Sequence, residues 1–128
     1  MADLVETWPT LTPRQRDARV AEALGWKHRP GSECPENALG GWYWPSGEYF
    51  GPSRPQFSGT WMWAGPLLDR LGELGWQTDL HRRPDGWRLH AFRPAEEGED
   101  YFNCMAQVGP SVIALALCFA RQKGAAHA

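Results

Sequence analysis

The chain has 128 residues, of which 42% are hydrophobic and 22% are charged, and its formal net charge is -2. This length and composition predict a single domain over residues 1–128, with a core spanning about 12–122, rather than a disordered chain. They exclude the overall basic excess that is typical of DNA-binding domains, and no apolar run reaches the roughly 18 residues of a membrane-spanning helix.

The first predicted element is a helix over residues 13–24. Thr12 is a suitable N-cap, and Pro13 suits the first helical position because its missing N–H would have no partner there. Gly25 follows at the C-terminal position that needs a positive φ, and Trp26 supplies the hydrophobic contact that often accompanies such an ending. The pattern therefore predicts both ends of this helix.

Residues 27–40 are polar, contain glycine and proline, and predict a loop. Five aromatic side chains then fall within residues 42–50. This stretch predicts a hairpin at the edge of a sheet, with Ser46 and Gly47 as a two-residue turn. Both surfaces of such a ribbon are aromatic, so one must be covered or remains an exposed apolar patch. The surface that we take as the candidate for partner binding carries Trp42, Trp44 and Tyr49.

An amphipathic pattern over residues 58–75 predicts the second helix, with Ser58 as its cap and Gly75 at its end. Pro66 lies inside this pattern. A proline within a helix removes one hydrogen bond and clashes with the preceding turn, which costs about 3 kcal/mol. We therefore expect a kink or a break between residues 62 and 66.

Residues 76–92 predict the clearest hairpin, because Asp85-Gly86 is a strong turn signal between two alternating runs. The alternation predicts one apolar face and one partly polar face. With these two residues as the turn, His81 lies opposite His90 on the polar face.

A metal ion is one ligand that this polar face could bind. Histidines on adjacent strands, here His81 and His90, can hold a metal, and Asp79 on the same face could be a third ligand. Arg83 and Arg88, which are predicted to face each other beside them, would repel a cation. We therefore predict neither a metal site nor a bound cofactor.

The segment 81–93 concentrates basic side chains, with only Asp85 against them, beside the acidic run at residues 96–100. Its arginines, Arg93 among them, could bind phosphate while Trp87 stacks on a base. The acidic run predicts a solvated loop, which could also mimic nucleic acid and bind a basic protein groove. The charged candidates for partner binding are Arg82, Arg83 and Arg88 in the basic patch, and Glu96, Glu97, Glu99 and Asp100 in the acidic run.

The three cysteines occur at no repeating interval and predict free thiols rather than disulfides or a zinc site. Cys104 and Cys118 lie in apolar patterns and are predicted core residues. Cys34 lies in the predicted loop and could be exposed, but no neighbouring base or anion-stabilising group supports a nucleophile there. The sequence therefore predicts no catalytic residue.

Residues 99–108 alternate as a further strand, and residues 109–124 predict a final helix with Pro110 near its start. This helix is apolar on nearly every side, which is typical of a buried helix. The order of elements predicts an α+β fold, namely an α/β/α layered sandwich with a mainly antiparallel sheet of about five strands and three helices.

Three stretches of the chain match the motifs of a known family in their order and spacing. “DARVAEALGWK” at 17–27 is similar to an opening helix that ends in a Gly-Trp pair. Residues 55–76 are similar to a segment with a proline, an aromatic residue and a serine that leads into an amphipathic helix. Residues 108–120 are similar to a closing helix. In this order they resemble the phage ABA sandwich domain family of bacteriophages and prophages. Thr60 departs from the family, which usually has an acidic residue there. The resemblance implies an α/β/α layered fold and a phage origin, and no established activity.

The residue composition favours a binding function over catalysis. Tryptophan, tyrosine and arginine dominate the energies of protein interfaces, and the chain has 8 tryptophans. With the family resemblance, this predicts a small phage- or prophage-encoded, non-enzymatic binding protein in the host cytoplasm, since the N-terminus does not resemble a signal peptide. The expected partner is a host protein or protein complex, as for an anti-CRISPR-like inhibitor of host defence. The alternative is a DNA-binding accessory protein of phage gene regulation.

Overall fold

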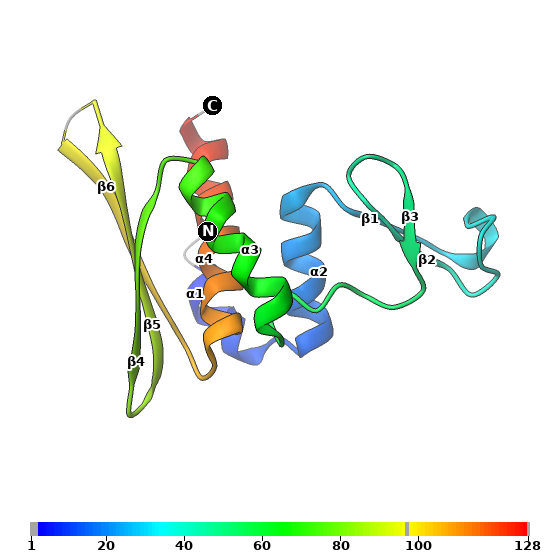
Figure 1. The fold of residues 1–128 in the computed structure, drawn as a ribbon, viewed down its shortest axis with the longest axis horizontal. Coiled ribbons are helices and arrows are strands. Elements are labelled where there is room, and N and C mark those ends of the chain that lie inside the picture. Colours follow the sequence, from blue (N-terminus) through cyan, green and yellow to red (C-terminus); the bar gives the residue numbers. More distant parts are fainter. Residues whose placement is uncertain (1–2, 97, 128) are drawn as a thin grey trace.

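The computed structural model describes residues 3–96 and 98–127 and has an α+β fold (Figure 1). Three long helices, α2 (Pro13–Leu24), α3 (Trp61–Glu73) and α4 (Gly109–His127), occupy the middle of the molecule. A three-stranded antiparallel sheet lies at each end. In the described part of the chain, no helix is both long and apolar enough to cross a membrane.

Helix α4 forms the centre of the core. It packs against α2, α3 and the larger sheet, and the side chains from Val112 to Leu117 are fully buried. The predicted buried helix is therefore confirmed. Its predicted end at Gly124 is wrong, because the helix continues to His127. A glycine inside a helix costs only about 1 kcal/mol relative to alanine, which is too little to end it here.

The larger sheet consists of β4 (Gln77–Arg83), β5 (Gly86–Ala95) and β6 (Gly98–Ala106), in that order. Helices α3 and α4 cover one face of this sheet, on which Leu89 and Phe102 are buried. The side chains of the opposite face reach solvent. The alternation therefore predicted the two faces correctly, and the strand expected over 99–108 is confirmed as β6.

The register of the β4–β5 hairpin differs from the prediction by two residues. Arg83 lies opposite Gly86, and His81 lies opposite Arg88 instead of His90. Both predicted pairs are therefore wrong, because the turn begins one residue earlier than expected. Since side chains alternate with a period of two, this even shift leaves each residue on its predicted face.

The smaller sheet consists of β1 (Lys27–Arg29), β2 (Gly41–Tyr43) and β3 (Tyr49–Gly51). Strand β1 and the 3₁₀ turn η2 (Gly31–Glu33) lie where a loop is predicted over 27–40. All three residues of β1 are exposed and polar, so the sequence offers no hydrophobic alternation that would predict a strand. Pairing with β2 decides its structure.

The two separate sheets correct the expected layered sandwich with one sheet of about five strands. The β2–β3 hairpin pairs with β1 and with none of the described strands of the larger sheet. Only two residues separate the end of α2 at Leu24 from the start of β1 at Lys27, which holds the hairpin beside α2 and away from β4–β6. The coarser prediction of an α+β fold with three long helices is confirmed.

Both ends of α2 form as predicted. The Thr12 hydroxyl accepts a hydrogen bond from the Gln15 N–H at 3.2 Å, and the Gln15 side chain accepts one from the Thr12 N–H at 2.9 Å. Gly25 has a φ of 91°, and the Trp26 N–H donates to the Ala21 carbonyl at 2.9 Å. Local capping chemistry thus defines this helix.

Helix α3 differs from the prediction at its start and in its middle. Thr60, and not Ser58, is its N-cap, because the Thr60 hydroxyl accepts from the Trp63 N–H at 3.4 Å. Pro66 lies inside a helix that continues from Trp61 to Glu73, so the break, one of the two expected outcomes beside a kink, does not occur. Burial of the apolar face of α3 against α4 can offset the cost of about 3 kcal/mol for an interior proline.

An N-terminal segment that the sequence patterns do not predict completes the core. It comprises α1 (Asp3–Thr7) and the 3₁₀ turn η1 (Trp8–Thr10). Trp8 is only 1% exposed, and its indole N–H donates to the Ser111 hydroxyl on α4 at 2.9 Å. The segment is too short for a helical period to be recognised.

Burial holds the thiols of Cys104 and Cys118 in their neutral form, and both residues lie in the core as predicted. Desolvation raises the pKa of each thiol from 9.0 to about 12. Above pH 9.0 the unfolded chain therefore loses thiol protons that the folded chain keeps. The thiol contribution to the free energy of unfolding should be fully present below that pH and fall toward pH 12.

Urea unfolding followed by circular dichroism at increasing pH measures this fall. The double variant Cys104→Ala/Cys118→Ala should show a weaker decline than the natural chain, because the other ionising groups are unchanged. An equal decline in both proteins would contradict the role of the thiols.

Candidate binding surfaces

The three aromatic candidates of the β2–β3 hairpin contact different rings: Trp42 lies against His28, Trp44 against Trp26, and Tyr49 against Tyr43. Tyr43, and not Trp44, is paired with Tyr49, and the register shifts between Trp42 and Tyr43. The turn is also longer than the predicted two residues, because the Trp44 N–H donates to the Glu48 carbonyl at 2.8 Å. A bulge changes the direction of successive side chains. The prediction that the three residues share one surface is therefore wrong.

Trp44 belongs to an aromatic cluster where the hairpin meets the helices. Trp26 is buried at the centre of this cluster, and its ring centroid lies 4.3 Å from that of Trp44. Aromatic pairs of this kind contribute about 0.5–1.5 kcal/mol beyond the burial of their area. The cluster therefore attaches the smaller sheet to the helices. Its other members are Phe50, Phe57 and Trp63.

An apolar groove with a volume of about 400 Å³ opens over this aromatic cluster and is lined on its α3 side by Met62 and Pro66. Trp44 is 40% exposed and Met62 is 78% exposed. Arg70 also lines the groove and forms an exposed ion pair with Glu73 at 2.8 Å. We call this feature the Trp44 groove. It presents aromatic and apolar side chains to solvent beside one arginine.

A buried carboxylate joins α2 to the segment before α3. Asp17 is only 1% exposed. Its Oδ1 atom accepts from the Ser58 N–H at 2.8 Å and from the Ser58 hydroxyl at 2.7 Å. Its Oδ2 atom accepts from Arg54 Nε at 2.7 Å. Ser58, the predicted cap of α3, is therefore part of this network instead. Asp17 lies on the apolar face of the helix predicted over 13–24, and this acidic residue was the sequence feature that could have indicated the network.

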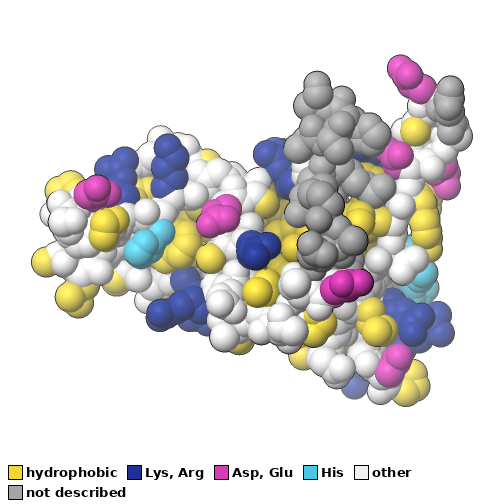
Figure 2. All heavy atoms as spheres, turned by 180° about the vertical axis from the view of Figure 1, so that it is seen from behind, with side chains coloured by type: hydrophobic (Ala, Val, Ile, Leu, Met, Phe, Trp, Pro, Cys, Tyr) yellow, Lys and Arg dark blue, Asp and Glu magenta, His cyan; other side chains and the backbone are white. Residues whose placement is uncertain are grey.

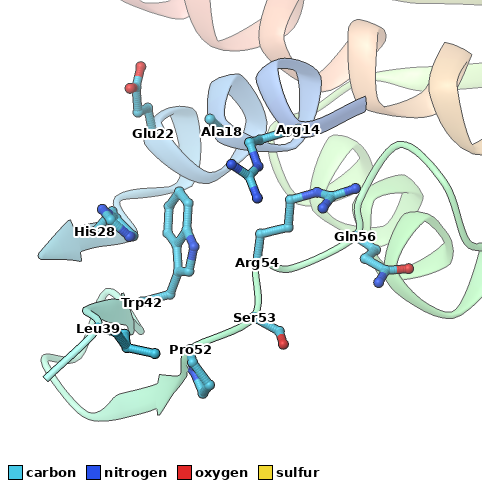
Figure 3. A pocket seen from close by; sticks show the side chains of 10 residues that line it. All are labelled: Arg14, Ala18, Glu22, His28, Leu39, Trp42, Pro52, Ser53, Arg54 and Gln56. Carbon is cyan, nitrogen blue, oxygen red and sulfur yellow. The ribbon is translucent and has the colours of Figure 1, made fainter. Parts of the chain in front are cut away.

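A second groove, with a volume of about 710 Å³, lies between α2 and the smaller sheet. Figure 3 shows Arg14 extending from α2 toward the Trp42 ring, and Arg54 extending from the segment after β3 with its guanidinium directed away from that ring. The His28 ring on β1 lies 4.9 Å from the Trp42 ring. We call this feature the Trp42 groove. Of its lining residues, sequence analysis identified Trp42 alone as a candidate.

The uncovered face of β4–β6 holds part of the predicted basic patch. Arg83 and Arg88 lie on this face near the β4–β5 turn, and Arg88 pairs with Asp85 at 3.4 Å. Farther along the sheet, the Tyr101 hydroxyl accepts from the Asn103 amide at 2.8 Å. This face therefore combines arginines with an exposed aromatic ring.

The other arginines of the predicted patch lie on the opposite side of the sheet. Arg82 is in register with Trp87 on the helix-covered side. Arg93 pairs with Asp100 through a 3.2 Å contact and lies 4.4 Å from the Trp76 ring centroid. The basic patch is therefore divided by the alternation of the strands, which a list of nearby arginines does not reveal.

The acidic run lies beside one arginine of the predicted patch, because Arg93 pairs with Asp100, but it lies at the opposite end of the sheet from Arg82, Arg83 and Arg88. Glu96 is exposed next to the β5–β6 turn, whereas Glu99 and Asp100 belong to β6. Glu97 lies outside the described residues. In Figure 2 basic side chains gather at the lower end of the right edge and acidic side chains at its upper end. The length of β5 separates the two groups.

The two histidines considered as metal ligands remain neighbours in spite of the register change. The ring centroids of His81 and His90 lie 5.6 Å apart. Tyr101 Oη lies 3.1 Å from His90 Nδ1. Among residues 3–96 and 98–127, no three or more histidine, cysteine, aspartate or glutamate side chains are grouped so that they could hold a metal ion.

Cys34 is buried, so the expectation that it could be exposed is wrong. The Tyr43 hydroxyl lies 3.3 Å from its sulfur and donates to Glu36. These hydrogen bonds, first that with Cys34 and then that with Glu36, raise the pKa of Tyr43. The contact with Tyr43 shields the Cys34 thiol from solvent. The polar composition of the loop predicted over 27–40 does not indicate this contact.

The comparisons with known proteins give no match for this chain. No family model matches it, and no curated protein or solved structure is significantly similar to it. The resemblance to the phage ABA sandwich domain family therefore stays a prediction.

Proposed function

We propose that this chain is a small phage- or prophage-encoded binding protein, without enzymatic activity, that covers a functional surface of a host protein complex. The observation that carries this proposal is the Trp44 groove. Tryptophan, methionine and arginine are enriched at protein interfaces, and tryptophan and arginine often dominate their energies. This groove places Trp44, Met62 and Arg70 around one apolar depression.

The occupant that fits the groove is a segment of the partner with an apolar anchor beside an acidic residue. The apolar anchor would lie against Trp44 and remove exposed aromatic surface from water. The carboxylate would bind Arg70. The present partner of Arg70 is Glu73, and an exposed ion pair of this kind contributes only about 0–1 kcal/mol, so it can be exchanged.

The partner class that we favour is a host defence complex, inhibited by occlusion in the manner of an anti-CRISPR protein. This choice rests on the predicted phage origin and on a surface suited to protein binding. The second candidate is a DNA-binding accessory protein of phage gene regulation. Its support is the presence of Arg83 and Arg88 on the uncovered face of β4–β6, although the net charge of -2 does not favour strong nonspecific binding.

Affinity capture from a bacterial host lysate, followed by titration of the purified captured complex, tests the proposal. The natural chain should recover one defined complex. Trp44→Ala should raise its Kd at least 30-fold, or by about 2 kcal/mol, the threshold for a dominant interface residue. Met62→Glu should weaken binding similarly, and it should preserve the fold because Met62 is largely exposed.

Trp42→Ala is the matched control, because Trp42 lies in the other groove, and it should change the Kd less than threefold. A captured complex that binds both Trp44 groove variants normally would contradict the proposal, as would recovery of no complex at all. Salt-sensitive binding of duplex DNA that is lost in Arg83→Ala/Arg88→Ala would instead favour the second candidate.

A further inference from the structure

Two arginines from distant parts of the chain line the Trp42 groove. Arg14 lies on α2, and Arg54 lies in the segment that follows β3. Arg14 forms no ion pair with any residue in the described ranges. Arg54 is oriented through its Nε atom by the buried Asp17, which leaves its terminal nitrogens for another acceptor. Two cations at one groove favour an anion between them.

An aromatic wall faces this cationic side of the groove. Trp42 is half-buried, and the His28 ring contacts it at 4.9 Å with an angle of 59° between the ring planes. This contact restricts the orientation of the Trp42 ring. Ala18 and Pro52 add apolar surface to the lining. A ligand that uses the whole groove therefore needs both an anionic group and a flat ring.

We propose that the Trp42 groove binds a nucleotide unit, with the phosphate at Arg14 and Arg54 and the base against Trp42. Arginine recognises phosphate through paired N–H donors, and a base stacked on an aromatic side chain contributes about 1–3 kcal/mol. This site is separate from the Trp44 groove and does not depend on the proposed protein partner.

The size and charge of the groove agree with this ligand. Its volume of about 710 Å³ is far larger than a simple anion needs and lies within the range of about 300–1,000 Å³ that is common for small-molecule sites. Glu22 is its acidic lining residue, and Figure 3 shows the Glu22 carboxylate pointing away from both arginines. Asp17 lies behind Arg54 and is already satisfied by three hydrogen bonds.

Isothermal titration of the full chain with adenosine 5′-monophosphate tests the site. Adenosine and inorganic phosphate, which each lack one part of the ligand, should bind at least tenfold more weakly. Arg14→Ala and Trp42→Leu should each raise the Kd for the nucleotide at least tenfold, which corresponds to about 1.4 kcal/mol. A short oligothymidylate that binds more tightly than the mononucleotide would identify single-stranded nucleic acid as the natural ligand. An oligothymidylate that binds more weakly than the mononucleotide would identify a free nucleotide.

Two matched controls separate this site from a general effect of charge or folding. Arg19→Ala removes an exposed arginine of the same helix, and Met62→Glu alters the other groove at a largely exposed side chain; both should retain the nucleotide affinity. No detectable nucleotide binding by a folded natural chain would overturn the inference. Phosphate binding as tight as nucleotide binding, or preferential binding of a phosphotyrosine peptide, would also overturn it.

Discussion

Replacing Asp17 with alanine should lower the free energy of unfolding by about 3–5 kcal/mol, the range expected when one partner of a buried ion pair is removed. The carboxylate is almost fully buried and accepts three hydrogen bonds, two from Ser58 and one from Arg54. Its loss leaves the two buried Ser58 donors without their acceptor and removes the partner of the partly exposed Arg54. Urea denaturation followed by circular dichroism gives the change directly.

Two further substitutions separate the effect of the Asp17 charge from a general effect of removing a carboxylate. Asp17→Asn keeps the volume of the side chain and an acceptor for Ser58, but it removes the charge that orients Arg54, so its loss of stability should be intermediate. Asp69→Ala removes an exposed carboxylate of α3 and should change stability by less than about 0.5 kcal/mol. A loss below about 1 kcal/mol for Asp17→Ala would contradict the importance of the network.

Trp8→Ala should destabilise the fold by about 3–5 kcal/mol, as is usual when a large aromatic side chain is removed from a core. Trp8 is among the largest fully buried side chains of the described residues. The substitution creates a cavity next to α4 and removes the hydrogen bond to Ser111. Thermal and urea unfolding should both report the loss.

Trp8→Phe distinguishes packing from hydrogen bonding at this position. Phenylalanine fills most of the space but leaves the Ser111 hydroxyl without its donor, so a smaller loss of about 1–3 kcal/mol is expected. Trp61→Ala, at a half-exposed tryptophan, should be milder than Trp8→Ala. Equal losses for Trp8→Ala and Trp61→Ala would show that the N-terminal segment is not part of the core.

Elements with local signals were predicted well. Helix α2 begins after Thr12 and ends at Gly25 because capping hydrogen bonds form within a few residues. The faces of β4 and β5 followed from alternation alone, although the register did not, since pairing depends on where the turn closes. Pro66 shows the opposite case, in which packing of the helix outweighs a local penalty.

The candidate surfaces were predicted only in part. Trp42 and Trp44 were both chosen for their aromatic character, but they lie in different grooves. Arg14 and Arg54 were not candidates, because 40 positions separate them in the sequence and nothing in either local pattern predicts that they meet. Asp17 on α2 accepts from Arg54 and so holds the segment before α3 next to the helix that carries Arg14.

The amino-acid sequence by itself determined the presence of the three long helices, both caps of α2, the inward and outward faces of the longer strands, and the burial of α4. These features depend on interactions between residues that are close in the chain, such as hydrophobic periodicity and capping. Only the tertiary structure decided that the strands form two sheets, that the arginines of the hairpin divide between two faces, and that Trp42 and Trp44 open onto different grooves. These outcomes depend on long-range pairing and packing, whose energies a local pattern does not contain.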